Sequence, residues 1–423
     1  MKMNIMKNIK EFIRPENIEF FLANTPQITF EVTDACNLNC TYCGYGDLYS
    51  DYDTRENKKL PLKKAIKLLD YLNRLWHSSM NLSYNKNVCI SFYGGEPLIN
   101  INFIRQVVEY VEKLDCPTRS FSFDMTTNAT LLSKNMDFLV KHNFHILISL
   151  DGDRENTAYR VDKKGNPTFN KIINNVDILK ERYPDYFKIF VNFNAVLHNK
   201  NSVESIYLFF KTKYNKVPRI SELNNMGIRE DKRDEFKKTY QDISESLYQS
   251  EHYTEIMKEM SSQLGTTKSL GTFLLRYSKF VYQNYNELIY GKPKKIKMIP
   301  TGTCLPFAKK IFMTVNGKLL PCERIGQQFA LGVVTKDGIE LDFKAIANKY
   351  NYYYAKIDKQ CKTCQNKKTC IQCIYNLPEL DKNPVCHGYM SHEDFENYKF
   401  TLLNFLANNP EEYYNIMNNL IIY

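Results

Sequence analysis

Three cysteines lie close together near the start of the chain. In the segment EVTDACNLNCTYCGYG, three residues separate Cys36 from Cys40 and two separate Cys40 from Cys43. A structural zinc site usually takes four protein ligands, whereas three thiolates can hold three corners of a cubane iron–sulfur cluster. The triplet therefore favours a cluster whose fourth iron is open to a substrate or cofactor. Zinc with a further ligand such as Cys89, or unligated core thiols, are the alternatives.

Seven of the other nine cysteines form a second group in the last third of the chain: Cys304, Cys322, Cys361, Cys364, Cys370, Cys373 and Cys386. Cysteines at such short spacings in a protein without an export signal indicate metal binding, and zinc ribbons are the simplest alternative to iron–sulfur clusters. Cys89, within an apolar strand, and Cys116, in a loop before a proline, match neither group.

The elements that must position the first triplet alternate between strands and helices. Apolar runs predict strands at 27–34, 88–93, 121–128, 145–152 and 188–197, and apolar residues at helical spacing predict helices between them. Such a βαβ series favours a parallel sheet with helices outside it, and about six units would make a partial (β/α)6 barrel similar to a TIM barrel. The active site of such a barrel lies at the C-terminal ends of its strands, which is where Cys36 falls.

The composition changes along the chain and predicts five segments: an N-terminal arm (1–26), an α/β barrel (27–226), a helical bridge (227–300), a cysteine-rich domain (301–390) and two closing helices (391–423) broken at Pro410. Within the cysteine-rich domain, FMTVNGKLLPC predicts a hairpin, because Asn316–Gly317 is a strong turn pair.

The overall composition is that of a cytoplasmic protein with an ordinary core. The chain has 423 residues, of which 43% are hydrophobic, and a net charge of +10. It has no signal-peptide pattern and no run of about 18 apolar residues. We attribute the positive charge to a solvated lysine-rich surface and expect neither nucleic acid nor a membrane as partner.

The spacing C-x3-C-x2-C just after a first strand, with Tyr42 before the last cysteine, resembles the radical SAM superfamily. In that family the open iron of a 4Fe–4S cluster binds S-adenosylmethionine (SAM), which is reductively cleaved to a 5′-deoxyadenosyl radical. The resemblance implies that Cys36, Cys40 and Cys43 hold such a cluster and that Tyr42 lies beside the cofactor.

Further motifs at later strand ends extend the resemblance. YGGEPL is similar to the turn that grips the SAM amino group, and TTNATLL resembles a TNGTLL stretch, with Ala129 where the family has glycine. The resemblance implies that SAM is contacted by Gly94, Gly95, Glu96, Asn128, Ser149, Arg160 and Asn194, with the backbone near Val196 as the alternative to Asn194. Asp151, in ISLDG, is expected to act either in substrate contact or in loop structure.

The second cysteine group resembles the SPASM extension of radical SAM enzymes, which holds two auxiliary 4Fe–4S clusters. The resemblance implies an outer cluster on Cys361, Cys364, Cys370 and Cys386 and an inner cluster on Cys304, Cys322 and Cys373, so three clusters in all. This chain departs from the pattern at the inner cluster, because it lacks the extra cysteine that some members carry before Cys304. We therefore expect an open iron or a ligand other than cysteine there.

SPASM enzymes mostly modify peptides or proteins, and two subclasses compete. Anaerobic sulfatase maturases oxidise Cys or Ser to formylglycine. They usually place an aspartate base directly after the cysteine of a Gly-x4-Cys segment, which here runs from Gly317 to Cys322. Here Glu323 follows Cys322. Together with the missing cysteine, this favours maturases of ribosomally made peptides, which install thioether, carbon–carbon or ether crosslinks or epimerise residues. Glu323 is then a candidate catalytic residue, or alternatively an ion-pair partner of Arg324 or Lys318.

The expected partners are a precursor peptide and a reductant such as ferredoxin or flavodoxin. We see no separate leader-binding domain before residue 27, so a leader would dock on the barrel, on the helical bridge or on another protein. A non-catalytic metal-binding scaffold is the rival from another class. It has no need of the glycine–glycine–glutamate turn, Ser149 and Arg160 beside the triplet, and their joint presence argues against it.

Overall fold

The structure is a computed structural model that describes residues 11–82, 86–260, 270–274, 299–368 and 370–419. The chain divides into two compact units. The barrel unit comprises Glu16–Ile256 and Leu305–Phe343, and the cysteine-rich unit comprises Met1–Pro15, Met257–Cys304 and Lys344–Tyr423.

The barrel unit is built on one sheet in the order β10-β9-β8-β7-β1-β2-β3-β4-β5-β6. Six strands run parallel, each paired with the next: β1 (Gln27–Thr33), β2 (Asn87–Gly94), β3 (Ser120–Thr127), β4 (His145–Ser149), β5 (Val191–Val196) and β6 (Arg219–Ser221). At the other edge, β7 (Ile311–Met313) pairs parallel with β1 and continues antiparallel into β8 (Lys318–Leu320), β9 (Gly332–Val334) and β10 (Ile339–Glu340).

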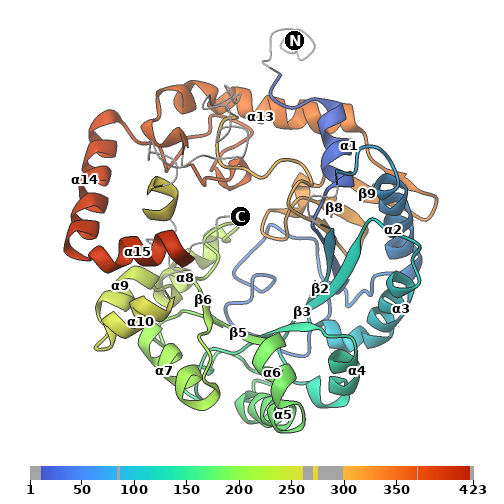
Figure 1. Cartoon of the computed structure of the whole chain (residues 1–423), viewed down its shortest axis with the longest axis horizontal. Coiled ribbons are helices and arrows are strands. Elements are labelled where there is room, and N and C mark those ends of the chain that lie inside the picture. Colours follow the sequence, from blue (N-terminus) through green and yellow to red (C-terminus); the bar gives the residue numbers. More distant parts are fainter. Residues whose placement is uncertain (1–10, 83–85, 261–269, 275–298, 369, 420–423) are drawn as a thin grey trace. The chain divides into compact units, whose positions relative to one another are not determined.

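Helices cover the outside of this sheet, as Figure 1 shows for α2 to α7. The helices that begin before residue 257 are α1 (Pro15–Ala23), α2 (Leu62–Trp76), α3 (Ile101–Glu112), α4 (Met136–Lys141), α5 (Phe169–Arg182), α6 (Pro184–Phe190), α7 (Val203–Tyr214), α8 (Arg233–Thr239), α9 (Ile243–Tyr248) and α10 (Tyr253–Met260). Each long helix buries one apolar stripe; Leu68 and Leu72 of α2 are fully buried. The predicted partial α/β barrel is confirmed.

Two features of the fold differ from the sequence-based prediction: the element at residues 188–190 and the boundary between the domains. Residues 188–190 belong to α6 rather than to a strand, because Pro184 at the first helical position starts a helix that runs to Phe190. The chain also divides elsewhere than predicted. Leu305–Phe343 belongs to the barrel unit because β7 joins β1, whereas the sequence pattern assigns these residues to the cysteine-rich domain. The hairpin around Asn316–Gly317 is confirmed as β7–β8.

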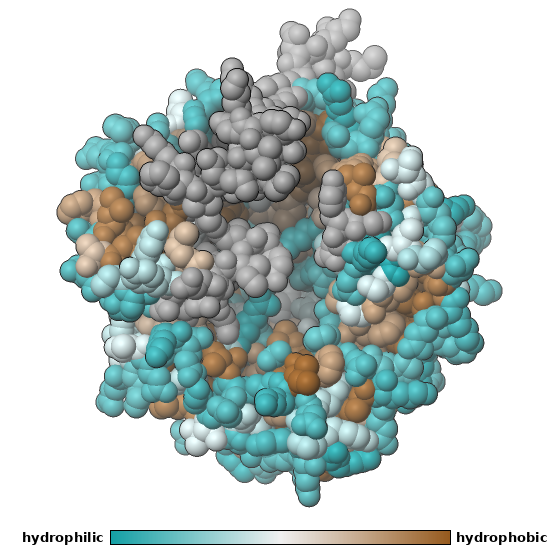
Figure 2. Space-filling model, in the orientation of Figure 1, coloured by the Kyte–Doolittle hydropathy of each residue, from teal (hydrophilic) through white to brown (hydrophobic). Residues whose placement is uncertain are grey.

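The cysteine-rich unit is mainly helical, with α13 (Phe343–Thr363), α14 (His392–Asn408) and α15 (Pro410–Asn419), and two short 3-10 turns, Gln365–Lys368 and Ile374–Asn376. The break at Pro410 is confirmed. A small core joins Phe395, Leu402 and Ile416 to Leu270 and Phe273. Figure 2 shows apolar side chains gathered over α14, where Phe400 and Leu403 are exposed.

The predicted helical bridge, residues 227–300, is helical in α8 to α10, and its residues 261–269 and 275–298 lie outside the described residues. Within the described part of the chain, no helix combines the length and the apolar character that a membrane span requires.

Candidate functional site

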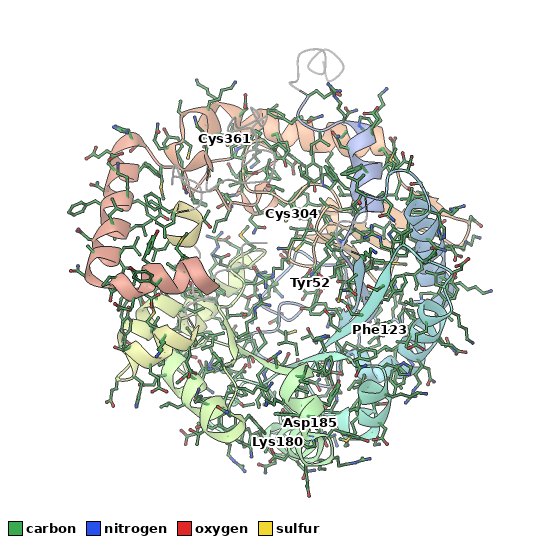
Figure 3. The ribbon with its side chains drawn as sticks, in the orientation of Figure 1. Tyr52, Phe123, Lys180, Asp185, Cys304 and Cys361 are labelled. Atoms are coloured by element: carbon green, nitrogen blue, oxygen red, sulfur yellow. The ribbon has the colours of Figure 1, made fainter. Side chains whose placement is uncertain are left out.

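The three cysteines of the first triplet lie on one loop (residues 34–46, the cysteine loop) at the C-terminal end of β1. The loop is tightly turned: the Cys43 amide donates to the Cys40 carbonyl (3.1 Å), and the Gly46 amide to the Cys43 carbonyl (2.7 Å). The hydroxyl of Tyr52, labelled in Figure 3, donates to the Gly46 carbonyl (2.6 Å). All three thiols are half-buried.

Burial raises the pKa of the Cys36 thiol, and raises that of Cys40 to about 12, with the neighbouring thiols adding to both shifts. The Cys36 and Cys40 thiols are therefore protonated in the metal-free chain. Bound iron would supply the positive charge that makes them thiolates. This donor set fits an iron–sulfur cluster that three cysteines hold.

The glycine–glycine–glutamate turn at the end of β2 runs directly against the start of the cysteine loop. The Gly95 amide donates to the Thr33 carbonyl and the Glu96 amide to the Ala35 carbonyl, both at 2.9 Å. A Cβ on Gly95 would lie 2.0 Å from the Ala35 carbonyl oxygen, and Gly94 has a φ of +126°. Glycine is thus required here so that two backbones can approach, whatever the turn binds.

The carboxylate of Glu96 is fully buried and joins the end of β2 to the end of β3. One oxygen accepts from the Thr127 hydroxyl (2.7 Å) and the Leu98 amide (3.1 Å), and the other accepts from the Asn128 amide (2.7 Å). Burial raises the pKa of Glu96 to about 7, against the opposing effect of these three donors. This bracing role was not among the sequence-based predictions. The contact of Glu96 with the SAM amino group stays a prediction.

Asn128 connects β3 to the cysteine loop. Its side-chain amide donates to Asn37 (2.9 Å) and lies 3.8 Å from the Cys36 sulfur, and its carbonyl accepts from the Thr130 hydroxyl (2.6 Å). The next residue, Ala129, is buried with a φ of +59°, which explains why glycine is the usual choice at this position. The predicted placement of Asn128 beside the triplet therefore matches the geometry.

Asp151 lies at the centre of a buried polar network that the sequence did not reveal. Its carboxylate accepts from Arg160 Nε and Nη2 and from the Val196 amide, each at 2.9 Å, and from the Tyr42 hydroxyl. His198 Nε2 lies 3.8 Å from the same carboxylate. Burial alone would raise the pKa of Asp151, but Arg160 and the surrounding donors lower it to about 2.

This network bears on three residues that the sequence analysis singled out: Asp151, Arg160 and Tyr42. Asp151 is fully buried and its contacts match the loop-structure role considered for it, while its contact with a substrate stays a prediction. The Arg160 side chain is 6% exposed and donates two hydrogen bonds to Asp151. Tyr42 is buried, and its ring stacks on the ring of His198 with 5.4 Å between the centroids. Both side chains face the network, and their contact with SAM stays a prediction. His198, two residues beyond β5, was missed because a single histidine carries no motif.

A row of short polar side chains lies at the ends of β4, β5 and β6. Ser149 and Asn194 are partners across β4 and β5, and the Ser221 hydroxyl donates to the Asn194 carbonyl oxygen (3.1 Å). Ser149 and Asn194 are half-buried. Such a row offers donors and acceptors at the barrel end where ligands of α/β barrels bind.

Glu323 follows β8 and forms an ion pair with Lys310 (2.9 Å), in which both side chains are less than one-fifth exposed. Of the two predicted alternative partners, Lys318 binds Asp53 (2.6 Å) instead, whereas the charge of Arg324 adds to that of Lys310 in lowering the pKa of Glu323. Burial tends to raise the pKa of Glu323, but Lys310 holds it below the ordinary value. The carboxylate is therefore ionised at neutral pH and can accept a proton.

Four cysteines of the cysteine-rich unit line one cavity of about 180 Å³. They are Cys361, Cys364, Cys370 and Cys386, the four expected to hold the outer cluster. Cys361, labelled in Figure 3, lies in the last turn of α13. Burial raises its pKa to about 12, and the other three thiols add to the shift. The cavity and its complete set of four thiols fit a closed cluster.

The remaining predicted ligands are divided between the units. Cys322 lies in the barrel unit, whereas Cys304 and Cys373 lie in the cysteine-rich unit, so the inner cluster stays a prediction. The Cys89 thiol donates to Asp124 of β3 (3.1 Å), which argues against Cys89 as a further ligand of the triplet. Among the described residues, no three His, Cys, Asp or Glu side chains are arranged to hold a single metal ion.

The comparisons with known proteins agree with this geometry. The family model of the Radical SAM superfamily matches residues 30–211. The chain contains a radical SAM domain. Proteins of this superfamily bind a 4Fe–4S cluster and SAM.

Relatives extend the similarity beyond the radical SAM domain. The chain is 32% identical over 181 residues to a cysteine-type anaerobic sulfatase-maturating enzyme of Clostridium novyi, a match that covers 42% of this chain and 45% of that protein. It is 24% identical over 400 residues to the enzyme of the same name from Clostridium perfringens, covering 89% of this chain and 96% of the relative. The chain thus spans about half the length of the first of these and nearly all of the second.

Among solved structures, the chain resembles native anSMEcpe with bound AdoMet, with a TM-score of 0.56 and 18% identity, covering 93% of this chain and 99% of that one. A second structure of that protein, with AdoMet and the Cp18Cys peptide, gives a TM-score of 0.53 at 20% identity, over 91% and 99% of the two chains. At these identities the likeness establishes the shared fold around the radical SAM domain.

Proposed function

We propose that this chain is a radical SAM maturase that oxidises a cysteine or serine side chain of a protein substrate to formylglycine, as anaerobic sulfatase-maturating enzymes do. The alignment with the Clostridium perfringens enzyme carries this proposal. A match confined to residues 30–211 would support SAM cleavage alone, whereas this one spans 89% of the chain and so includes cysteines of the second group. It supports sulfatase maturation better than the peptide crosslinking that Glu323 had suggested.

The barrel unit supplies the binding groups. Cys36, Cys40 and Cys43 would hold the SAM-binding cluster, and the row around Ser149 and Asn194 would hold the nucleoside. When bound, the clusters supply the electron that cleaves SAM and accept the electron that the substrate loses. The glycine–glycine–glutamate turn fixes the start of the cysteine loop, which keeps the three thiols together at the barrel end.

Glu323 is the proposed base. Its ion pair with Lys310 keeps it ionised, and it would take the thiol proton of a cysteine substrate. Bound SAM would supply the group that takes a hydrogen atom from the substrate's Cβ, and a bound cluster would accept the one electron that the substrate loses. The resulting thioaldehyde is hydrolysed by water to formylglycine and hydrogen sulfide. Glutamate reaches one methylene further than the usual aspartate, so the backbone around Cys322 can lie further from the substrate.

Crosslinking of a ribosomally made peptide is the second candidate, together with the precursor peptide as its partner. Two observations favour it: glutamate in place of aspartate after Cys322, and no further cysteine shortly before Cys304. A relative named radical SAM cyclopropyl synthase TigE, from Paramaledivibacter caminithermalis, is also 27% identical over 174 residues, although the match covers only 35% of that protein.

The test uses the full chain, purified anaerobically, reconstituted with iron and sulfide and reduced. It is incubated with SAM and a sulfatase peptide that carries either cysteine or serine at the modified position. We expect 5′-deoxyadenosine and a matching amount of peptide aldehyde, measured by mass spectrometry. Release of 5′-deoxyadenosine with both peptides unmodified would contradict sulfatase maturation and favour crosslinking. No release from a fully loaded, reduced chain would contradict both candidates.

A further inference from the structure

The cysteine loop is fastened by a segment that lies far along the sequence. Residues 159–162, which we call the clasp, run antiparallel to residues 38–41, with Leu38 bridged to Asp162. The Asn39 amide donates to the Val161 carbonyl (2.8 Å), and the Thr41 amide donates to the Tyr159 carbonyl (3.2 Å). The backbone between the first and second cysteines and that between the second and third are therefore both tied to the clasp.

The clasp is in turn fixed by Asp151. Arg160 points from the clasp to the buried Asp151 carboxylate, with two hydrogen bonds of 2.9 Å in a bidentate pair. Asp151 is itself anchored to β5, because its carboxylate also accepts a hydrogen bond from the Val196 amide (2.9 Å). A bidentate pair with both partners buried fixes orientation as well as distance. The clasp is thus connected to the sheet through Asp151.

Tyr42 provides a third connection, from within the cysteine loop itself. It lies between Cys40 and Cys43, and its hydroxyl donates to Asp151. Its ring packs between His198, at 5.4 Å, and Tyr159 of the clasp, at 6.2 Å. One carboxylate therefore holds the cysteine loop by two routes, directly through Tyr42 and indirectly through Arg160.

We propose that Asp151 is a positioning residue that locks the cysteine loop through Arg160 and Tyr42, so that the three thiols are fixed before the cluster binds. The benefit for cluster binding rests on the proposed function, whereas the lock is a property of the chain alone. Because the lock also defines where Tyr42 lies, its loss changes how SAM approaches the cluster.

The test compares four variants of the full chain with the wild type, metal-free and reconstituted. Asp151→Asn keeps the shape and removes the charge. Asp151→Asn combined with Arg160→Gln removes both charges, so that no buried cation is left unpaired. Tyr42→Phe removes only the direct bond. Asp177→Asn is the matched control, since Asp177 also binds a cation and a tyrosine, Lys213 (2.9 Å) and Tyr214 (2.8 Å), between α5 and α7.

The decisive readout is hydrogen exchange at the amides of residues 38–43 in the metal-free chain, which needs neither cluster nor activity. We expect Asp151→Asn to speed this exchange by about tenfold or more and Tyr42→Phe by about threefold, with no change in Asp177→Asn. The double variant should regain melting temperature relative to Asp151→Asn and still exchange fast. In the reconstituted chain, the first two variants should lose iron from the three-cysteine site faster and show an altered electron paramagnetic resonance response to SAM.

Unchanged exchange at residues 38–43 in Asp151→Asn, or the same increase in Asp177→Asn, would overturn the proposal. If Asp151→Asn does not fold, the Tyr42→Phe variant tests the proposal instead, because it keeps the ring and the buried ion pair. Unchanged exchange at residues 38–43 in Tyr42→Phe would then contradict the proposal. A wild-type chain that binds no cluster would contradict the proposed function, and the exchange result would still stand.

Discussion

The two cysteine groups are supported by different kinds of structure. The first group lies on a short loop held by backbone and side-chain bonds from three neighbouring strand ends and from the clasp. The four outer cysteines of the second group are spread from the last turn of α13 to Cys386 and line a cavity of about 180 Å³. The first group offers three thiols in a rigid setting, and the second offers four around a preformed space.

This difference corresponds to the number of ligands that each site provides. Four thiols complete the coordination of a cubane, so the cluster itself can hold its loops together. Three thiols leave one iron open, and the protein must then fix the geometry that the missing fourth bond would have provided. We therefore expect the cysteine loop to be rigid before its cluster binds and the four-thiol site to depend more on its metal.

The largest effect is expected from the first group. Replacing Cys36, Cys40 and Cys43 together by Ala should reduce 5′-deoxyadenosine formation to background, because no open iron is left to bind SAM. Iron per chain should fall from about twelve to about eight if three cubanes are present. Chromatography of the nucleoside and iron analysis measure the two effects. SAM cleavage that persists in this variant would contradict the assignment of the open iron to the first cysteine group.

The second group should behave in the opposite way. Replacing Cys361, Cys364, Cys370 and Cys386 by Ala should remove about four irons and lower the melting temperature of the cysteine-rich unit. The spectroscopic response of the remaining clusters to SAM should persist. If this variant instead loses the SAM response and keeps its iron, the assignment of the open and closed sites is reversed.

Glu323→Gln should lower the turnover of a cysteine peptide by about a hundredfold, because the amide cannot accept the proton, while Glu323→Asp should retain more activity.

The pKa of Glu323 lies below its ordinary value, so activity should fall only in the acidic range. Lys310→Met removes the charge that lowers this pKa and leaves burial to raise it. The acidic limb of the pH profile should therefore move to higher pH. A limb that does not move in Lys310→Met would exclude Glu323 as the base.

Glu96→Gln should destabilise the barrel unit by about 1–3 kcal/mol, since one amide nitrogen would face a backbone or hydroxyl donor that now binds a carboxylate oxygen. Glu109→Gln is the matched control, because Glu109 is exposed on α3 and pairs with the exposed Lys113. Denaturant unfolding of the metal-free chains measures both. Equal stability of the two variants would show that the brace between β2 and β3 contributes little.

The smallest effect is expected from Ala129→Gly. Ala129 has a φ of +59°, which costs an L-residue about 1 kcal/mol, and glycine avoids this cost. The variant should be stabilised by about 0.5–1 kcal/mol with unchanged cluster content. A clear loss of stability would mean that the buried methyl group of Ala129 contributes more through packing than the backbone strain costs.

The sequence predicted the parts of the molecule that depend on periodic or closely spaced residues. Strands β1 to β4, their helices, the first cysteine triplet and the four cysteines around the cavity follow from alternation, helical spacing and short cysteine intervals. It missed the start of α6, where Pro184 overrides an apolar run, and β6, whose three residues carry no pattern. The joining of β7 to β1 is also invisible, because it pairs residues about 280 positions apart.

The same distinction applies to the site. Cys36, Asn128 and Glu96 lie in recognisable motifs, and the structure brings them together. The Asp151 network could not be predicted, because its members come from four separate segments and His198 carries no local signal. Lys310, the partner of Glu323, was missed for the same reason. Burial then decides their state: a carboxylate with two arginine bonds is a structural anchor, whereas the same aspartate on a surface loop could serve as a base.

The central claim is that the three-cysteine site presents an open iron to SAM. It is tested most directly by electron paramagnetic resonance of the reduced, reconstituted full chain with and without SAM carrying a nitrogen-15 label on its amino group. We predict a changed cluster signal and a hyperfine coupling to that nitrogen, both absent in the Cys36, Cys40 and Cys43 variant. Identical spectra with and without SAM, in a chain that holds its full iron, would contradict the account.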